Sequence, residues 1–377
     1  MNALVLCNRP PDPLGTGDAK IAAHAIRVLI EGGYGVAVIR RSEVRPTTGL
    51  MHRLASIAAG GPLQMAITYS TAFHQAIETA TASQTPDVIV AIHARTAQYV
   101  PHHLRARAFA VIIDAYGRNY ASYGAAVHFP ESILYRAERR RMARYEAMLA
   151  REFGAVGLVA PIDKRLLARE APWRPKAVVH LPYAVDLAYF QPRRIVRTGH
   201  TRFLFTGRLN YLPNEDAAIQ LMSAVWPLLR STVPGAQLTI AGAGPSKALF
   251  RLAREQGVEI KADPPDLRDL MASSRAMIVP MRIGGGVQTK VLEAMATQLP
   301  VICTSFANSG LEAQHGEHLL LADDPPSIVR QAQWVIRRPA DAQAMATRAR
   351  SWVEAHHSHS NFAEPFISAC NRLATTH

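Results

Sequence analysis

The sequence is poor in cysteine and has no long apolar run, and these absences exclude several classes of protein. Its 377 residues include three cysteines, Cys7, Cys303 and Cys370. Their odd number and wide spacing argue against a disulfide framework and a zinc site, and they fit a reducing compartment. No run of about 18 apolar residues occurs, so no membrane-spanning helix is predicted. The opening residues Met1–Cys7 are too short for a secretory signal and have no basic segment, so we expect a cytoplasmic location.

Acidic residues are scarce relative to basic ones. There are 29 Asp and Glu against 42 Lys and Arg, which gives a formal net charge of +13. A basic chain can bind nucleic acid, an anionic membrane or anionic substrates. The sequence carries no signature of a nucleic-acid-binding fold, so we expect no nucleic-acid partner.

The densest basic cluster lies in one predicted helix, Ser132–Phe153. Its arginines are Arg136, Arg139, Arg140, Arg141 and Arg144. The apolar residues interleaved with them at near-helical spacing are Tyr135, Met142, Tyr145, Met148 and Leu149. This pattern favours peripheral contact with anionic lipid on the inner face of the cell membrane, where each basic residue contributes about 1 kcal/mol. The alternative is an ordinary amphipathic surface helix whose charge is balanced by Glu138, Glu146 and Glu152.

Apolar residues make up 49% of the chain, enough for sizeable cores, and the length suggests two domains. Short apolar runs alternate with helical patterns along both halves, which predicts an α/β fold with two doubly wound parallel sheets. We expect a first domain over residues 1–190 and a second over 191–356. A C-terminal segment, 357–377, is expected to return to the first domain.

The most informative segment is the glycine-rich stretch that follows the predicted strand Ala276–Pro280. The triplet Gly284–Gly286 leaves backbone N–H groups uncovered where a helix should begin, and such groups form an anion site. Lys290 and Glu293 lie three residues apart on one face of that helix, so the lysine can reach phosphate and the glutamate can accept from sugar hydroxyls. The alternative is a plain glycine-rich turn with a surface ion pair.

A second cationic motif follows the predicted strand Phe203–Thr206. Gly207 permits close approach of the backbone, and Arg208 offers a planar fork for a diphosphate, although Gly-Arg is also a common turn. Lys290 is inferred to supply a second cation. Two side-chain cations make a metal unnecessary for a departing diphosphate, and no Asp-x-Asp pair lies nearby. We therefore predict no metal and no cofactor.

The N-terminal half offers candidates for chemistry at predicted strand ends. Asp114 follows the strand Phe109–Ile113, where a carboxylate can act as a general base or anchor a loop. His93 also ends a strand, with Arg95 beside it, although a lone histidine is more often structural. Gly15–Asp18 follows the first strand and opens the first helix; its alternative role is an N-cap at Gly17–Asp18.

Together these motifs resemble those of the glycosyltransferase 4 family ("glycosyl transferases group 1"), in a form similar to a branch associated with bacterial exopolysaccharide clusters. The resemblance implies the GT-B fold, in which a first Rossmann-like domain binds the acceptor and a second, facing it, binds a nucleotide sugar. The family commonly carries two glutamates eight residues apart. Here Glu293 matches the second, but Gly285 stands at the first position.

The resemblance implies roles for individual residues. Those predicted to bind the donor are Gly15, Gly17, Gly207, Arg208, Gly242, Ile260, Gly284, Gly285, Gly286, Val287, Lys290 and Glu293. Asp18 and Arg95 are predicted to face the acceptor, and Asp114 and His93 to be catalytic.

The function implied is transfer of a sugar from a UDP- or GDP-linked donor to a hydroxyl of a bacterial glycan or lipid-linked acceptor. Family precedent is retention of anomeric configuration, whereas Gly285 and Asp114 leave inversion open. The alternatives are a nucleotide-sugar epimerase and a non-catalytic sugar-nucleotide-binding component of a polysaccharide assembly complex.

Overall fold

The computed structural model describes residues 1–13, 15–43, 57–58, 60–126, 130–170, 178–193 and 201–376. The chain forms two compact units. The first comprises Met1–Ala184 together with His359–His377, and the second comprises Val185–Ser358. Among the described residues, no helix is both long and apolar enough to cross a membrane.

The first unit is built on a six-stranded sheet in which every strand pair is parallel. The strand order is β2-β1-β3-β4-β5-β6. The strands are β1 (Asn2–Cys7), β2 (Gly35–Arg40), β3 (Val88–Ile92), β4 (Ala108–Ile112), β5 (Ala155–Leu158) and β6 (Val178–His180). Strands β3 and β4 are apolar and completely buried, as expected for central parallel strands covered on both faces. The direction of strand succession reverses between β1 and β3, and such switch points are where open α/β sheets bind ligands.

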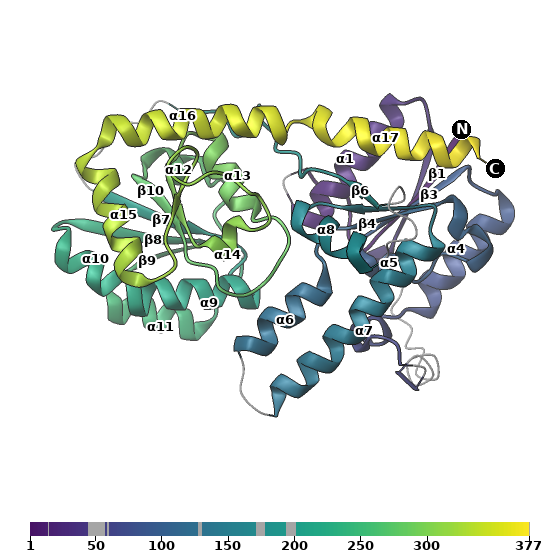
Figure 1. The fold of residues 1–377 in the computed structure, drawn as a ribbon, viewed down its shortest axis with the longest axis horizontal. Helices are drawn as coiled ribbons and strands as arrows, with labels where there is room; N and C mark the ends of the chain where they lie inside the picture. The colour runs from purple at the N-terminus through teal and green to yellow at the C-terminus, as the bar shows by residue number, and fades with distance from the viewer. Residues whose placement is uncertain are drawn as a thin grey trace. The chain divides into compact units, whose positions relative to one another are not determined.

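Helices cover both faces of this sheet (Figure 1). They are α1 (Gly17–Glu31), α3 (Leu63–Ile67), α4 (Thr71–Ser83), α5 (Ala94–Ala97), α6 (Tyr116–Ala126), α7 (Glu131–Glu152), α8 (Pro161–Glu170) and α17 (His359–Thr375), with short 3-10 turns η1 (Arg41–Glu43) and η2 (His102–Arg107). Helices α6 and α7 lie side by side.

Helix α17 belongs to the first unit although it is distant in sequence, and it packs beside α1 (Figure 1). Phe366 stacks on Phe109 of β4 with ring centroids 5.5 Å apart. The Tyr34 hydroxyl donates to Oδ1 of Asn371 at 2.8 Å. These contacts fix the C-terminal helix to the core of the first unit.

The second unit contains another parallel six-stranded sheet, with the order β12-β11-β10-β7-β8-β9. Its strands are β7 (Thr201–Thr206), β8 (Ala236–Gly242), β9 (Glu259–Ala262), β10 (Ala276–Val279), β11 (Val301–Cys303) and β12 (Leu320–Leu321). The succession reverses between β7 and β10, so the switch point lies where these strands end.

The helices of the second unit follow the predicted pattern with one difference. They are α9 (Leu212–Gln220), α10 (Trp226–Thr232), α11 (Lys247–Gln256), α12 (Arg268–Ser273), α13 (Thr289–Ala296), α14 (Ser305–Asn308), α15 (Pro325–Arg337) and α16 (Pro339–His356). The sequence pattern predicts a single helix over Asp216–Leu229, but the structure has α9 and α10 joined by a π-helical turn, η4 (Leu221–Val225). Pro227 explains the interruption, because proline has no N–H and its ring displaces the carbonyl four residues earlier.

Candidate functional site

The loops that leave β7 and β8 interlock at the carboxyl edge of the second sheet. The N–H of Gly207 donates to the carbonyl of Ala241 at 3.1 Å, and that of Leu209 donates to Ala243 at 2.7 Å. Gly242 has φ +153°, and a Cβ there would lie 1.7 Å from the carbonyl oxygen of Gly207. Only glycine at position 242 therefore allows the two loops to approach this closely.

Lys290 is a buried cation in the first turn of α13. Its side chain is covered, with 8% of the residue exposed. Nζ donates to Oδ1 of Asn214 at 2.7 Å and to Oε1 of Gln288 at 3.1 Å. Burial lowers the pKa of Lys290 to about 8, and Glu293 acts against this decrease. A buried ammonium held by neutral oxygen atoms is suited to an incoming anion.

Asn214 is a site residue that the sequence reasoning missed. Besides accepting from Lys290, its Nδ2 donates to the backbone carbonyl of Arg208 at 3.0 Å. Gly207 makes room for it, since a Cβ at that position would lie 2.9 Å from Cγ of Asn214. Asn214 thus links the Gly-Arg turn to α13. The available signal was its place in the sequence, shortly after the Gly-Arg motif.

Arg208 is half-buried, and its guanidinium lies over the ring of Tyr211 at 5.4 Å. Within the part of the chain that the structure describes, no carboxylate forms an ion pair with it. The stacked guanidinium keeps its fork of donors available.

The glycine-rich loop before α13 is held in a left-handed conformation at two positions, Gly284 (φ +111°) and Gly286 (φ +62°). Gln288 is the N-cap of α13 but makes no side-chain capping bond; its Nε2 donates to the carbonyl of Gly285 at 3.3 Å. Arg282 anchors the loop through two bonds to Asp216 of α9, at 2.8 and 2.7 Å. The N–H groups at the helix start are therefore not covered by a side-chain cap.

The remaining predicted donor residues of the second unit lie at or near the same edge. Val287 is half-buried in the loop. Glu293 lies one turn after Lys290, is 7% exposed and acts electrostatically on Lys290. Ile260 is half-buried in the edge strand β9, paired in register with Ile240.

In the first unit, the segment after β1 does not form an N-cap at Gly17–Asp18, which was the alternative role predicted for it. Helix α1 begins at Gly17, and its N-cap is Thr16, which makes no side-chain capping bond because its hydroxyl donates to Asp18. The N–H of Gly15 donates to the carbonyl of Asp12 at 3.2 Å. Arg9 lies 3.9 Å from the carboxylate of Asp18.

His93, after β3, is held in an unusual conformation with φ +84°. Its Nδ1 accepts from the N–H of Arg95 at 3.1 Å, and its Nε2 lies 2.7 Å from the hydroxyl of Tyr116. Burial, followed by the nearby charge of Arg95, lowers the pKa of His93 to about 3. A neutral ring whose Nδ1 accepts must carry its proton on Nε2, so this nitrogen donates to Tyr116.

Asp114 lies in the loop between β4 and α6. Burial, then the charges of Asp163 and Asp18, raise its pKa to about 7, while Arg118 and Arg95 oppose the increase. The carboxyl therefore gains and loses its proton near neutral pH, as a general base requires. Asp18 and Arg95 also act on His93. The four ionisable residues predicted in this unit, Asp18, His93, Arg95 and Asp114, therefore come together at one sheet edge.

Sequence reasoning missed Tyr116 and Asp163. Asp163 lies at the start of α8, after β5, and is 1% exposed. The strand-end criterion that identified His93 and Asp114 would also have selected it. Tyr116 directly follows the Asp114 loop, but a tyrosine in that place gives no specific signal.

Helix α7 presents its acidic and basic residues to different environments. Glu138 and Glu146 are buried; they accept from the backbone N–H groups of Gln64 at 3.2 Å and Tyr116 at 2.7 Å. These two glutamates are therefore buried instead of lying on the outer face, and Glu138 still balances one arginine of the cluster, Arg141, at 3.6 Å. Of the interleaved apolar residues, Met142 and Leu149 are buried. The exposed side chains of the helix include Arg136, Arg139, Arg140 and Arg144, together with Ile133 and Leu134, which are each 54% exposed.

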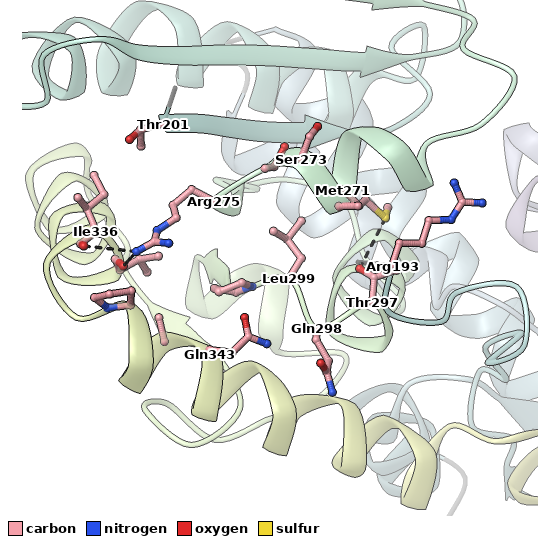
Figure 2. Close-up of a pocket in the computed structure, with 16 residues that line it drawn as sticks. Arg193, Thr201, Met271, Ser273, Arg275, Thr297, Gln298, Leu299, Ile336 and Gln343 are labelled. Carbon is pink, nitrogen blue, oxygen red and sulfur yellow. Dashed lines mark hydrogen bonds between the residues drawn. The ribbon is translucent and has the colours of Figure 1, made fainter. Parts of the chain in front are cut away.

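A pocket of about 280 Å³ lies elsewhere in the second unit (Figure 2). It is lined by Thr201 at the start of β7, and by Arg275 and Pro300 just before β10 and β11. It is thus at the amino ends of the strands, whereas the predicted donor residues gather at the carboxyl ends. Figure 2 shows Arg275 directed at the carbonyl of Ile336. Among the residues described, no group of three His, Cys, Asp or Glu side chains is arranged to hold a metal ion.

Comparison with known proteins identifies the second unit. Residues 200–338 match the family model described as Glycosyl transferases group 1. An uncharacterized 44.6 kDa protein in the cps region of Klebsiella pneumoniae is 30% identical over 130 residues. The match covers 32% of this chain and spans 33% of that relative, about a third of its length.

Solved structures are similar over the whole chain. Sucrose-phosphate synthase from Thermosynechococcus elongatus has a TM-score of 0.74 at 16% identity, with 100% of each chain covered. HepE from Anabaena in complex with UDP-glucose has a TM-score of 0.66 at 13% identity, covering 100% of this chain and 99% of that one. WaaG, a glycosyltransferase involved in lipopolysaccharide biosynthesis, has a TM-score of 0.66 at 15% identity and covers 99% of both chains. The second unit therefore contains a segment that matches the glycosyl transferases group 1 model, and the chain as a whole has the GT-B fold of these solved structures.

Proposed function

We propose that the protein transfers a sugar from a nucleoside-diphosphate donor to a hydroxyl of a bacterial surface glycan or glycolipid, without a metal ion. The observation that carries this proposal is Lys290, a buried ammonium with neutral partners at the switch point of the second sheet. Arg208 and the uncapped start of α13 add donors for the same diphosphate. Two cations and a helix terminus can stabilise the leaving group that a metal would otherwise neutralise.

The nucleotide and the acceptor are suggested by the relatives. HepE has been solved with UDP and with UDP-glucose, which supports a UDP-linked donor over GDP. The Klebsiella relative lies in a cps region, and WaaG is involved in lipopolysaccharide biosynthesis, which supports a cell-surface glycan or lipid-linked acceptor. Glu293 would accept hydrogen bonds from the ribose hydroxyls, and the segment around Ile260 would line the base.

The chemistry assigned to the first unit is proton removal from the acceptor hydroxyl. Asp114 would act as the base, with Asp18 and Arg95 facing the acceptor and the neutral His93 holding Tyr116. Gly15 and Gly17 would approach the donor diphosphate. With Asp114 as base the transfer inverts the anomeric configuration; in a retaining transfer the leaving phosphate takes the proton instead, and Asp114 is dispensable.

We further propose that the outer face of α7 contacts anionic lipid on the cytoplasmic side of the membrane. Arg136, Arg139, Arg140 and Arg144 are exposed, whereas Glu138 and Glu146 are buried, and Glu138 forms an ion pair with the half-buried Arg141. Ile133 and Leu134 add exposed apolar surface at one end of the helix.

Calorimetric titration of UDP and GDP in the presence of EDTA tests the donor site. Lys290→Met should weaken UDP binding by roughly tenfold to a hundredfold. A lost charge-assisted hydrogen bond costs about 1.5–3 kcal/mol of binding free energy, which corresponds to this change in affinity. The control is Lys247→Met, because Lys247 is an exposed lysine of the same unit. Equal affinities for the two variants, or binding that requires a divalent metal, would contradict the proposal.

One alternative retains specific support, namely a non-catalytic sugar-nucleotide-binding protein. Gly285 stands where the family commonly has a glutamate, so a group that contacts the donor sugar is lacking at that position. Incubation of UDP-sugars with a bacterial lipid extract distinguishes the two functions. Release of free UDP that depends on the extract supports transfer, whereas tight UDP-sugar binding without release supports the alternative.

A further inference from the structure

The loop that carries Asp114 is held by two buried carboxylates from different helices. Oδ2 of Asp163 accepts from the backbone N–H of Ala115 at 3.4 Å, and Oε1 of Glu146 accepts from that of Tyr116 at 2.7 Å. These N–H groups stand at the start of α6 and have no partner within the helix. The two carboxylates therefore complete the helix start and fix the residues that follow Asp114.

We propose that Asp163 is a positioning residue for Asp114, which it serves in two ways: it anchors the loop, and its charge keeps Asp114 protonated into the neutral pH range. The inference rests on the proposed function, since only there is Asp114 the base. Nothing in the family match includes this residue, because the matched segment is 200–338.

The electrostatic part of the argument follows from what faces Asp114. Four charged groups act on it from four elements: Asp163 of α8, Asp18 of α1, Arg118 of α6 and Arg95 of α5. After burial, Asp163 has the largest influence, and it raises the pKa of Asp114. Burial also raises the pKa of Asp163 itself, but Arg118 opposes this, with Nη1 3.4 Å from Oδ1 of Asp163. The ion pair favours the charged form of Asp163, and that charge disfavours a second one on Asp114.

Glu146 supplies a matched control. It is buried, at 6% exposed, and it clamps the neighbouring N–H of the same loop, but it is not one of the four groups above. Asp163→Asn and Glu146→Gln each remove one buried charge and keep an acceptor oxygen for the backbone. Both variants therefore weaken the clamp to a similar degree, and only Asp163→Asn removes the charge that acts on Asp114.

The experiment is a pH titration of aspartate carboxyl groups by carbon-13 NMR in the full-length protein. The resonance of Asp114 is assigned as the one that is missing from the spectrum of Asp114→Asn. In Asp163→Asn the midpoint of Asp114 should move to lower pH by about one pH unit or more, because a like charge is lost and Arg118 is released. In Glu146→Gln it should stay near its original value. An unchanged midpoint in Asp163→Asn, or an equal shift in both variants, would overturn the inference.

The unmodified protein provides a second test if Asp163→Asn does not fold. Two interacting carboxyls titrate as a pair, so the resonances of Asp114 and Asp163 should each respond to the ionisation of the other. Independent single-step curves would also overturn the inference. Because neither measurement uses turnover, failure of the base role proposed for Asp114 would instead appear as full transferase activity in Asp114→Asn with the electrostatic coupling intact, and failure of the proposed transfer itself would appear as no activity in the unmodified protein.

Discussion

At the residue scale, the contact proposed between Lys290 and the donor diphosphate would link donor binding to pH. The ordinary lysine pKa of 10.5 is lowered to about 8 by burial of Lys290, so the ammonium is fully charged only below this value. A bound diphosphate favours the charged form and therefore raises the pKa in the complex. Above pH 8 the protein must take up a proton when the ligand binds.

We expect UDP affinity to fall as pH rises above about 8, by up to tenfold per pH unit. Calorimetry at pH 8.5 in two buffers of different ionisation enthalpy measures the proton uptake directly. Lys290→Met should show none. Affinity that is constant from pH 7 to 9.5 would mean that this ammonium does not meet the diphosphate.

Single residues also show what sequence reasoning can and cannot find. His93, Asp114 and Asp18 were identified because the carboxyl ends of parallel strands meet at one edge, so position along the chain implies proximity. Asn214 was missed because a neutral amide has no obvious affinity for phosphate. Its importance follows from contacts with Arg208 and Lys290, which depend on how two distant segments pack.

At the element scale, the strands were the most predictable parts and the helix interruptions the least. The sequence after the glycine-rich loop predicts a helix over Thr289–Ala296, and α13 has these bounds, because the loop and an amphipathic pattern define the helix start. The π-helical turn Leu221–Val225 was not predicted, since a proline in a helical pattern can end, kink or widen a helix. The two-residue strand β12 is too short to show a recognisable pattern of hydrophobic residues in the sequence.

The interlocked loops after β7 and β8 lead to a prediction of stability. Gly242→Ala should destabilise the second unit by about 2–4 kcal/mol, because the new methyl group would overlap the carbonyl of Gly207. Gly235→Ala is the control: it also has a positive φ of +74°, but nothing lies within 4 Å of the added Cβ. Gly235→Ala should lower the free energy of unfolding by only about 1 kcal/mol. Urea denaturation measures both, and equal losses would show that conformation, not space, governs position 242.

Helix α7 leads to a prediction of lipid binding. The double variant Arg139→Glu and Arg140→Glu should lower binding to vesicles containing anionic lipid by at least roughly thirtyfold, given about 1 kcal/mol per basic residue. A matched double variant, Arg251→Glu and Arg254→Glu, changes net charge equally on exposed positions of α11. Co-sedimentation at low and high salt compares them. An equal loss in the two double variants would indicate attraction by net charge alone, without a dedicated face.

At the scale of the whole molecule, the first unit is assembled from two separate parts of the chain, residues 1–184 and 359–377. A chain shortened to residue 358 lacks α17 and uncovers apolar surface that Phe362 and Phe366 now cover. We expect limited proteolysis of this shortened chain to degrade the first unit and leave the second protected. Equal resistance of both units would show that α17 adds little to the first unit.

The divided first unit also has a consequence for biosynthesis. During translation the second unit has all its residues before the first does, because helix α17 of the first unit follows the second unit in the sequence. The incomplete first unit must wait while about half of the chain is synthesised, with the surface that α17 will occupy still open. The first unit can therefore reach its observed structure only after synthesis has passed the whole of the second unit.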